Sequence, residues 1–368
     1  MQYRSFGKLA WKPSALGFGC MRLPTIDGVQ AGANINEPEA IKMIRLAIDE
    51  GVNYVDTAYY YHQGKSELVT GKALQDGYRQ RVRIATKLPV WLINDPGDFD
   101  RLLDEQLNKL STDHIDFYLF HALNQKSWTN SVLKHNLLTK ALSAISDGRI
   151  HHIGFSFHDS YECFEEIVKA FNWDFCQIQY NYMDIHNQAG TKGLKLAARR
   201  GLGVVVMEPL MGGLLANPPE VVRKAIDKLP EPCSPSELAL KWVWNQSEVS
   251  LVLSGMSSME QVEENLASMT DLAHANGIRV VLCSILPAFD YPWQPGLTPA
   301  PKIDLINAWL RGFATAKGYV YVDFHSAMKD GRDGLPANLS KDGVHPLPAG
   351  YAVMAPLAEA GIDKALRQ

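Results

Sequence analysis

The chain has 368 residues, of which 46% are hydrophobic and 21% charged, an ordinary globular composition. Its net charge of −4 and the lack of long runs of like charge exclude the basic surface that a nucleic-acid partner requires. No stretch reaches about eighteen uninterrupted apolar residues, and residues 1–8 lack the apolar segment of a signal peptide, so we expect a cytoplasmic protein with small-molecule rather than membrane partners. The 5 cysteines lie far apart without a C-x-x-C pair, which indicates neither disulfides nor an iron–sulfur or other local metal motif.

Short apolar segments alternate with amphipathic segments over most of the chain. The first predicted strand is Ala15–Met21, and its helix, Glu37–Glu50, is ended by Gly51. Further strands are predicted at 53–56, 82–87, 115–121, 152–156, 175–180, 203–207 and 249–254, and the helices between them at 66–74, 97–110, 132–146, 161–170, 191–200 and 236–245. Strands that are apolar almost throughout, separated by amphipathic helices, indicate a parallel sheet covered on its outer face. Eight such units favour a (β/α)8 TIM barrel over an open sheet.

The segment after the eighth strand is unusual for a barrel. Residues 257–261 contain two overlapping capping boxes, and an apolar stripe then runs from Val262 to Leu272 until Asn276-Gly277. A ninth strand at Ile278–Leu286, a proline-rich loop, and a helix at 302–316 follow, and then a tenth strand at 319–324 and a last helix at 351–366. A barrel does not need these elements. They predict a partial open parallel sheet of the flavodoxin-like kind, whose earlier strands are missing.

Three successive predicted strands end in ionisable residues. Asp56 ends one strand and is followed by Tyr61, Lys87 ends the next, and His121 ends the third. Because the carboxyl ends of barrel strands share one rim, these four side chains are expected to converge there.

This rim suits the reduction of a carbonyl. A carbonyl that accepts hydride becomes an alkoxide, which needs a proton or a positive field. We expect Tyr61 to be the acid, Lys87 to lower the pKa of its phenol, and Asp56 to keep Lys87 charged. His121 would orient the substrate oxygen or pass a proton to Tyr61.

Small residues near the ends of the seventh and eighth strands suit a pyrophosphate, because they allow backbone approach and a helix N-terminus attracts anions. They are Gly212, Gly213, Gly255, Ser257 and Ser258. A plain turn and helix cap is the alternative. Gln261 and Asn265, four residues apart, share a face of the same helix.

These motifs give residues 1–267 a resemblance to the aldo/keto reductase family. The matching stretches are Val55-Asp56-Thr57-Ala58 with Tyr61 and Gly64-x-Ser66-Glu67, then Ala85-Thr86-Lys87, then Asp116-Phe117-Tyr118-Leu119-x-His121. The resemblance implies a (β/α)8 barrel, an extended NADP or NAD cofactor, and reduction of aldehydes or ketones. It also puts Asp56, Tyr61, Lys87 and His121 at the catalytic positions.

Further cofactor contacts are implied by the same resemblance. Ser156 and Gln177 map to the carboxamide contacts, Phe157 replaces the usual Asn, and Met207 replaces the aromatic residue that commonly stacks on the nicotinamide. These departures resemble a bacterial branch that often carries a C-terminal iron–sulfur segment, and no such cluster is expected here. Asn265 and Gln261 would face the adenosine end. Gln261 stands where an Arg often pairs with the 2′-phosphate, so NADP, favoured by the family, and NAD both stay open.

Residues 268–368 have a different resemblance. Asp342-Gly343-Val344-His345-Pro346 resembles the end of an SGNH (GDSL-type) hydrolase, with Asp342 and His345 in its acid and base positions. The Gly-Asp-Ser nucleophile, oxyanion-hole and Gly-x-Asn-Asp blocks are missing, so these two residues are expected to be vestigial. We therefore expect two domains, 1–267 and 268–368, fused within the eighth helix. The alternatives are an esterase with a serine borrowed from the barrel or a partner chain, and a non-catalytic barrel scaffold.

The C-terminal segment has two strands where the hydrolase sheet has five. A parallel pair cannot satisfy its outer backbone groups alone. We therefore expect the segment to dock near the eighth helix or to complete its sheet by dimerisation, which leaves monomer and dimer open, and the loop between Pro287 and Lys302 to be exposed to proteases.

Overall fold

The computed structural model describes residues 1–228, 233–275, 279–292, 296 and 298–367. The chain forms two compact units, Met1–Met269 and Thr270–Gln368. No helix among the described residues is long and apolar enough to span a bilayer.

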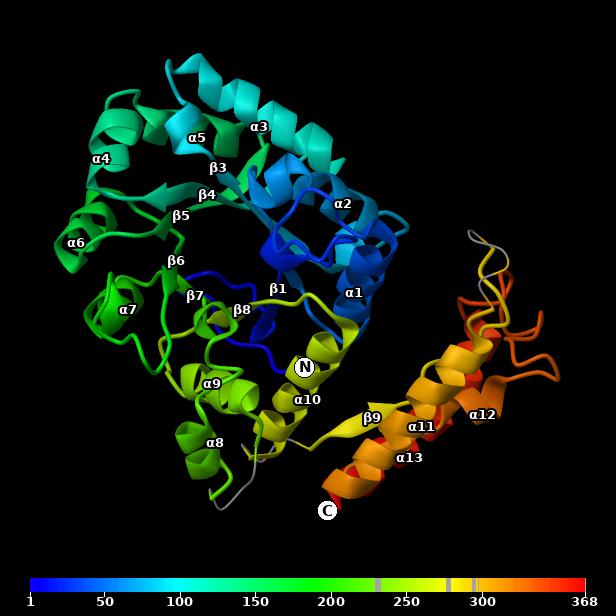
Figure 1. Ribbon diagram of the computed structural model, residues 1–368. Coiled ribbons are helices and arrows are strands. Elements are labelled where there is room, and N and C mark those ends of the chain that lie inside the picture. The colour runs from blue at the N-terminus through cyan, green and yellow to red at the C-terminus, as the bar shows by residue number, and fades with distance from the viewer. Residues whose placement is uncertain (229–232, 276–278, 293–295, 297, 368) are drawn as a thin grey trace. The chain divides into compact units, whose positions relative to one another are not determined.

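The first unit is a closed barrel of parallel strands in the order β1 to β8 (Figure 1). The strands are β1 Leu16–Gly19, β2 Tyr54–Asp56, β3 Arg83–Leu88, β4 Ile115–Leu123, β5 Ile150–Phe157, β6 Phe175–Gln179, β7 Gly203–Met207 and β8 Leu251–Gly255. The barrel closes where Gly19 of β1 lies opposite both Asp56 of β2 and Gly255 of β8. The predicted (β/α)8 fold is confirmed.

Helices cover the outside of the barrel (Figure 1). They are α1 Glu37–Asp49, α2 Ser66–Ala73, α3 Gly97–Leu110, α5 Leu137–Ser146, α6 Tyr161–Ala170, α7 Gly190–Arg199, α9 Pro235–Trp244 and α10 Met259–Ala275, with the additional short helices α4 Gln125–Ser127 and α8 Glu220–Ile226. The helix predicted at 132–146 is wrong in its first turn. A π-helical turn at Trp128–Leu133 comes first, and Asn136 then takes a left-handed conformation (φ 52°), which asparagine tolerates better than most residues.

Aromatic rings fill the barrel near the start of its strands. Phe6 packs edge-on against Phe117 with ring centroids 5.2 Å apart, and Trp11 lies 5.3 Å from Phe117. Tyr54 and Phe175 belong to the same buried cluster. Because this end is packed solid, a site for chemistry is left to the other end, where the strands finish.

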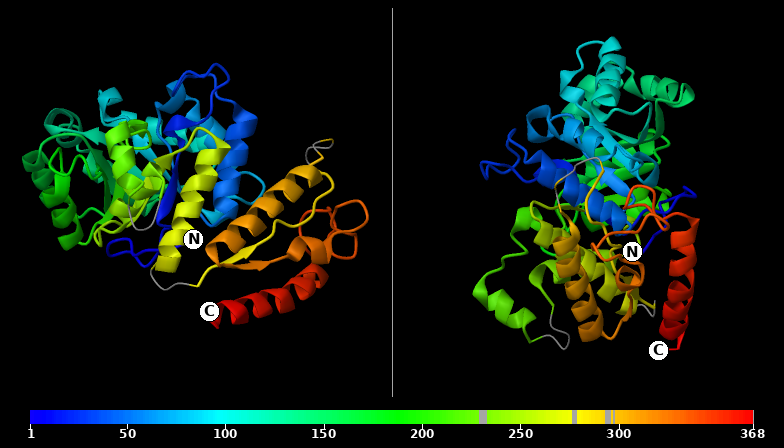
Figure 2. Two further views of the ribbon diagram at one scale, coloured as in Figure 1. Left: turned by 60° about the horizontal axis from the view of Figure 1, so that its bottom comes forward. Right: turned by 90° about the vertical axis from the view of Figure 1, so that its right-hand side faces the viewer.

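The second unit contains a parallel pair, β9 Val281–Cys283 and β10 Val320–Val322. Its helices are α11 Ala300–Lys317, α12 Phe324–Met328 and α13 Pro348–Leu366. Figure 2 shows α11 and α13 on opposite sides of the strand pair. At Gly361 of α13 an added Cβ would lie 2.3 Å from a methyl of Val322, so the helix approaches β10 closely. Within the described residues this sheet has two strands.

Both strands of the second unit are shorter than expected. Ile278, where the ninth strand was predicted to begin, and Asn276-Gly277, where the eighth helix was predicted to end, lie outside the described residues. β9 ends early because the side chain of Asn307 binds the backbone of Ile285, accepting from its N–H at 2.7 Å and donating to its carbonyl at 3.0 Å. β10 ends at Val322 because Asp323 caps α12, accepting from the backbone N–H of Ser326 at 3.0 Å.

Candidate active site

Lys87 is the centre of the group at the rim. Its Nζ donates to Asp56 Oδ1 at 2.6 Å, to the carbonyl of Thr57 at 2.8 Å and to the hydroxyl oxygen of Tyr61 at 3.1 Å. Lys87 is 1% exposed and Asp56 2%. The ends of β2 and β3 therefore hold a carboxylate, an ammonium and a phenol in direct contact, as their positions at the strand ends predicted.

A strained turn presents Tyr61. His62 and Gln63 both have left-handed backbone conformations, with φ of 52° and 55°. The buried His62 ring holds this turn against the loop after β1, because its Nε2 accepts from the backbone N–H of Leu23 at 3.0 Å and its Nδ1 donates to the carbonyl of Gly32 at 2.7 Å. No sequence motif singles out His62, and its place beside Tyr61 is the one signal in the sequence that points to it.

Burial controls the protonation of the site. Burial raises the pKa of Tyr61 above its ordinary value, although Lys87 acts in the opposite direction. Burial likewise raises the pKa of Asp56 against the effect of Lys87. Burial alone would lower the pKa of Lys87, but Asp56 and Tyr61 outweigh it and hold the net pKa above the usual range. The expected net lowering of the Tyr61 pKa is therefore wrong, because desolvation outweighs the neighbouring ammonium.

His121, which belongs to β4, lies beside the Tyr61 phenol. Its ring centroid is 6.0 Å from that of Tyr61 and 5.1 Å from that of Trp91. Burial, with help from Lys87 and His158, holds the pKa of His121 well below the usual value, so the imidazole is neutral at neutral pH. Its buried Nδ1 has no hydrogen-bond partner in the described part of the chain. A neutral ring of this kind suits hydrogen bonding to a substrate oxygen.

Ser156, Gln177 and Met207 lie on the neighbouring strands β5, β6 and β7. Gln177 Nε2 lies 3.6 Å from Met207 Sδ, and Gln177 Oε1 is buried without a hydrogen-bond partner among the described residues. Ser156 Oγ accepts from the backbone N–H of Ala122 at 2.7 Å and keeps its own proton to donate. An unsatisfied acceptor beside a free hydroxyl donor fits a carboxamide such as that of nicotinamide.

The predicted pyrophosphate residues lie after β7 and β8. Gly212 and Gly213 have φ of 69° and 98°, which favours glycine. An added Cβ at Gly255 would lie 3.2 Å from Cδ of Arg22. Ser257 and Ser258 precede α10, whose N-terminus is suited to an anion.

The two polar residues predicted to share a face of α10 differ in exposure. Gln261 is exposed, and its Oε1 accepts from the backbone N–H of Ser257 at 2.8 Å. Asn265 is 3% exposed and donates to Ser254 Oγ at 2.9 Å. Gln261 therefore binds the backbone just before α10, while Asn265 joins α10 to β8 by a hydrogen bond.

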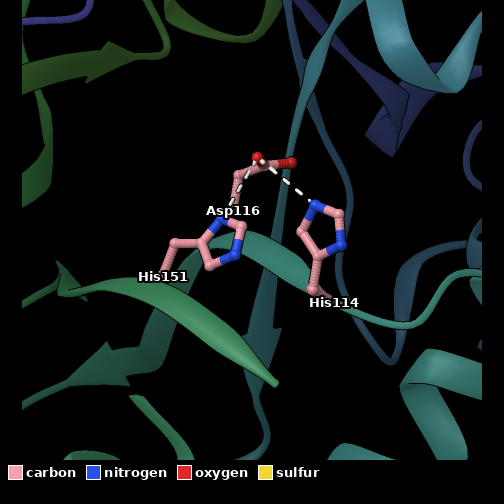
Figure 3. A group of neighbouring side chains, drawn as sticks. All are labelled: His114, Asp116 and His151. Atoms are coloured by element: carbon pink, nitrogen blue, oxygen red, sulfur yellow. Dashed lines mark ion pairs between the residues drawn. The ribbon is translucent and has the colours of Figure 1, made fainter. Parts of the chain in front are cut away.

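A second titratable cluster lies near the opposite end of the barrel. His114, Asp116 and His151 offer ligand atoms within 4.8 Å of one another, and both rings lie beside the Asp116 carboxylate (Figure 3). That carboxylate already pairs with Arg79 at 2.9 Å and Arg83 at 2.6 Å. Two guanidinium groups this close would repel a metal cation, so the cluster is better described as an ion-pair network.

In the second unit, Asp342 and His345 are hydrogen-bonded. His345 Nδ1 donates to Asp342 Oδ2 at 2.7 Å, and the backbone N–H of His345 donates to Asp342 Oδ1 at 2.8 Å. Burial tends to raise the pKa of Asp342, but these bonds outweigh it and lower the pKa below its usual range. A cavity of about 270 Å³ lies beside Asp342 and is also lined by Phe289 and Arg332.

Residues 15–276 match the model of the aldo/keto reductase family, and the chain therefore belongs to this family. Residues 252–353 match the model of the GDSL-like lipase/acylhydrolase family, so this second match begins within β8 and both matches include α10. The resemblances read from the sequence motifs are thus confirmed.

Characterised relatives and solved structures agree with the family match. The chain is 28% identical to L-galactose dehydrogenase of Arabidopsis thaliana over 292 residues, which cover 74% of this chain and 89% of the relative. It is 28% identical to the NADH-specific methylglyoxal reductase of Escherichia coli over 264 residues, 60% of this chain and 79% of the relative. The holo form of an aldo-keto reductase from Bacillus halodurans superposes with a TM-score of 0.61 at 26% identity, covering 73% of this chain and 91% of that one. The protein is an oxidoreductase of this family.

Proposed function

We propose that the protein reduces aldehyde or ketone carbonyls to alcohols, with a nicotinamide dinucleotide as hydride donor and Tyr61 as the general acid. One observation carries this proposal: buried Lys87 bonds to Asp56 at 2.6 Å and to the Tyr61 hydroxyl at 3.1 Å. A phenol in contact with a buried ammonium can give up a proton and leave a stabilised phenolate.

The four rim residues divide the proton chemistry among them. The neutral His121 ring and the Tyr61 hydroxyl hold the substrate oxygen, and Tyr61 donates its proton as negative charge develops there. Burial keeps the phenol protonated at neutral pH, and Lys87 lowers the cost of the phenolate that remains. Asp56 keeps Lys87 charged, because burial alone would favour its neutral form.

The cofactor residues fit a nicotinamide dinucleotide. When bound, the reduced dinucleotide supplies the hydride. Ser156 and Gln177 would bind the carboxamide, because one offers a hydroxyl donor and the other an unsatisfied acceptor. Met207 would lie against the nicotinamide ring. The glycines after β7 and β8, with Ser257 and Ser258, would bind the diphosphate.

The adenosine end bears on the choice between NADP and NAD. Gln261 and Asn265 would lie at this end, and Gln261 offers no charge to a 2′-phosphate. Both NADP and NAD therefore fit the proposed site. Fluorescence titration with NADPH and NADH, compared at one ionic strength, separates them.

The decisive test is Tyr61→Phe, which keeps the ring and removes the proton. We expect kcat to fall by roughly 10²- to 10⁴-fold, the usual contribution of a general acid. Tyr60→Phe is the matched control, because this neighbouring phenol is 49% exposed and lies outside the proposed mechanism. Retention of more than half of the wild-type rate by Tyr61→Phe removes Tyr61 from the mechanism.

We further propose that residues 268–368 form a separate domain without hydrolase activity, and that the protein works in the cytoplasm as a monomer or as a dimer formed through this segment. Within the described residues the sheet of the second unit has two strands, which supports the dimer, because parallel sheets normally have more strands. Light scattering at several protein concentrations distinguishes the two states.

A further inference from the structure

Arg22 lies where three barrel strands end. It is the last residue of a 3-10 turn, Cys20–Arg22, that directly follows β1. Its Nη1 donates to the carbonyl of Gly212, after β7, at 3.3 Å. Its Cβ, Cγ and Cδ all lie within 3.4 Å of the position that a Cβ would take at Gly255, the last residue of β8. The side chain therefore extends across Gly255 toward Gly212.

Gly255 makes room for this side chain. Gly255 does not need glycine for its backbone conformation, since its φ is not positive, but a methyl group there would press on the stem of Arg22. At Gly212 an added Cβ would lie 3.5 Å from Nη2. The guanidinium is thus held close to the backbone of Gly212, and the stem of Arg22 lies against Gly255, two residues before Ser257.

Among the described residues, the charge of Arg22 is not neutralised by an ion pair. In the part of the chain that the structure describes, no carboxylate lies within ion-pair distance of Arg22, whereas Arg79, Arg81 and Arg83 of the same unit each have one. A guanidinium has five N–H donors, and a single hydrogen bond to a carbonyl uses one of them. The other N–H groups of the guanidinium can therefore donate to an anionic ligand.

The turn that carries Arg22 is fixed on both sides. The carbonyl of Cys20 accepts from Ser66 Oγ at 3.0 Å, and the N–H of Leu23 is bound by the His62 ring at 3.0 Å. Both partners belong to the segment that follows Tyr61. Arg22 is therefore positioned by the same contacts that position the proposed acid.

We propose that Arg22 binds the diphosphate of the nicotinamide dinucleotide, which extends the proposed function and rests on it. The planar guanidinium would give paired, charge-assisted hydrogen bonds to phosphate oxygens, while Gly212 and Gly255 let the diphosphate approach the backbone. Ser257, Ser258 and the start of α10 would complete the site on its other side.

The test compares Arg22→Met with wild type in ligand binding. Met keeps an apolar stem and removes the charge. Titration with NADH and NADPH should show dissociation constants raised by roughly 10- to 100-fold, the usual loss for a charged hydrogen bond. Competition by ADP and by adenosine shows whether the lost affinity comes from the diphosphate. The variant should bind adenosine as wild type does and lose most of the preference for ADP.

Arg199→Met is the matched control, because this exposed arginine ends α7 near the opposite end of the barrel and its removal changes the net charge equally. It should bind every ligand as wild type does. Arg22→Lys keeps the charge without the fork, and it should retain part of the ADP preference. If Arg22→Met does not fold, Arg22→Lys provides the test. Full wild-type affinity of Arg22→Lys for ADP would refute the paired hydrogen bonds.

Two outcomes separate this inference from the proposed function. If wild-type protein binds neither NADH nor NADPH, the proposed function fails and the role of Arg22 with it. If wild type binds them and Arg22→Met binds ADP equally well, or loses ADP and adenosine affinity in the same proportion, the role of Arg22 alone is refuted.

Discussion

Replacing Lys87 with Met tests whether the buried charges act on stability and on catalysis separately. The change removes an ammonium that is 1% exposed and keeps a side chain of similar length. Asp56 Oδ1 then loses its 2.6 Å partner, and Asp56 Oδ2 already has no hydrogen-bond partner among the described residues. The variant must bury an uncompensated carboxylate or protonate it.

The expected loss is large. Breaking a buried ion pair by removing one partner costs roughly 3–5 kcal/mol of the free energy of unfolding. At about 2–4 °C per kcal/mol for a unit of this size, the melting temperature should fall by roughly 6–20 °C. Burial raises the pKa of Asp56 although Lys87 acts to lower it, so removal of Lys87 should raise that pKa further and the folded variant should bind this proton more tightly than folded wild type does. The deficit should therefore be smaller at pH 5 than at pH 8.

A second change separates the two roles of Lys87. In Lys87→Met with Asp56→Asn, no buried charge is left unpaired, so most of the melting temperature should return. The rate of hydride transfer should stay low, because Tyr61 still lacks its cation. Thermal unfolding followed by circular dichroism and single-turnover oxidation of the reduced dinucleotide measure these two quantities. A rate that recovers together with stability would falsify the electrostatic role of Lys87, and an unchanged melting temperature in Lys87→Met would refute the stability argument.

Three further predictions concern other parts of the chain. The pKa of His121 is held below the usual value of about 6.5, so as the pH falls the unfolded state binds a proton at this residue before the folded state does. Wild type therefore loses stability between pH 7 and pH 5, and His121→Gln should lose less, as measured by urea unfolding. Hydrolysis of p-nitrophenyl acetate should be absent or unchanged in His345→Ala; a rate that this variant abolishes would show a working hydrolase site. Limited proteolysis should cut first between Pro287 and Lys302, where residues 293–295 and 297 lie outside the described residues. Mass spectrometry identifies the first fragments, and first cuts within the barrel would contradict this prediction.

The barrel and the position of its rim residues follow from the sequence because their determinants are local. Asp56, Lys87 and His121 each lie at the end of an apolar strand or within two residues of it, and parallel strands in one barrel bring such ends together. The 2.6 Å bond between Lys87 and Asp56 is the result of that rule. The family motifs select the same residues, and the family match covers the stretch in which they lie.

What the sequence did not predict depends on contacts between distant segments. The direction of the Tyr61 pKa reflects how deeply the phenol is buried, which no strand pattern reports. β9 ends early because Asn307, more than twenty residues later, binds its backbone continuation. Arg22 follows the end of β1, so the rule that selected Lys87 could have selected it, but its path across Gly255 is visible only in three dimensions.

The seam between β1 and β8 ties the two ends of the first unit together during synthesis. β1 lies near residue 16 and β8 ends at Gly255, so the seam cannot form until nearly the whole barrel has been translated. More than a hundred residues then remain to be made. At about 5–20 residues per second, their translation takes roughly 5–20 s. Translation of the C-terminal segment thus gives the ribosome-bound barrel an interval in which to close.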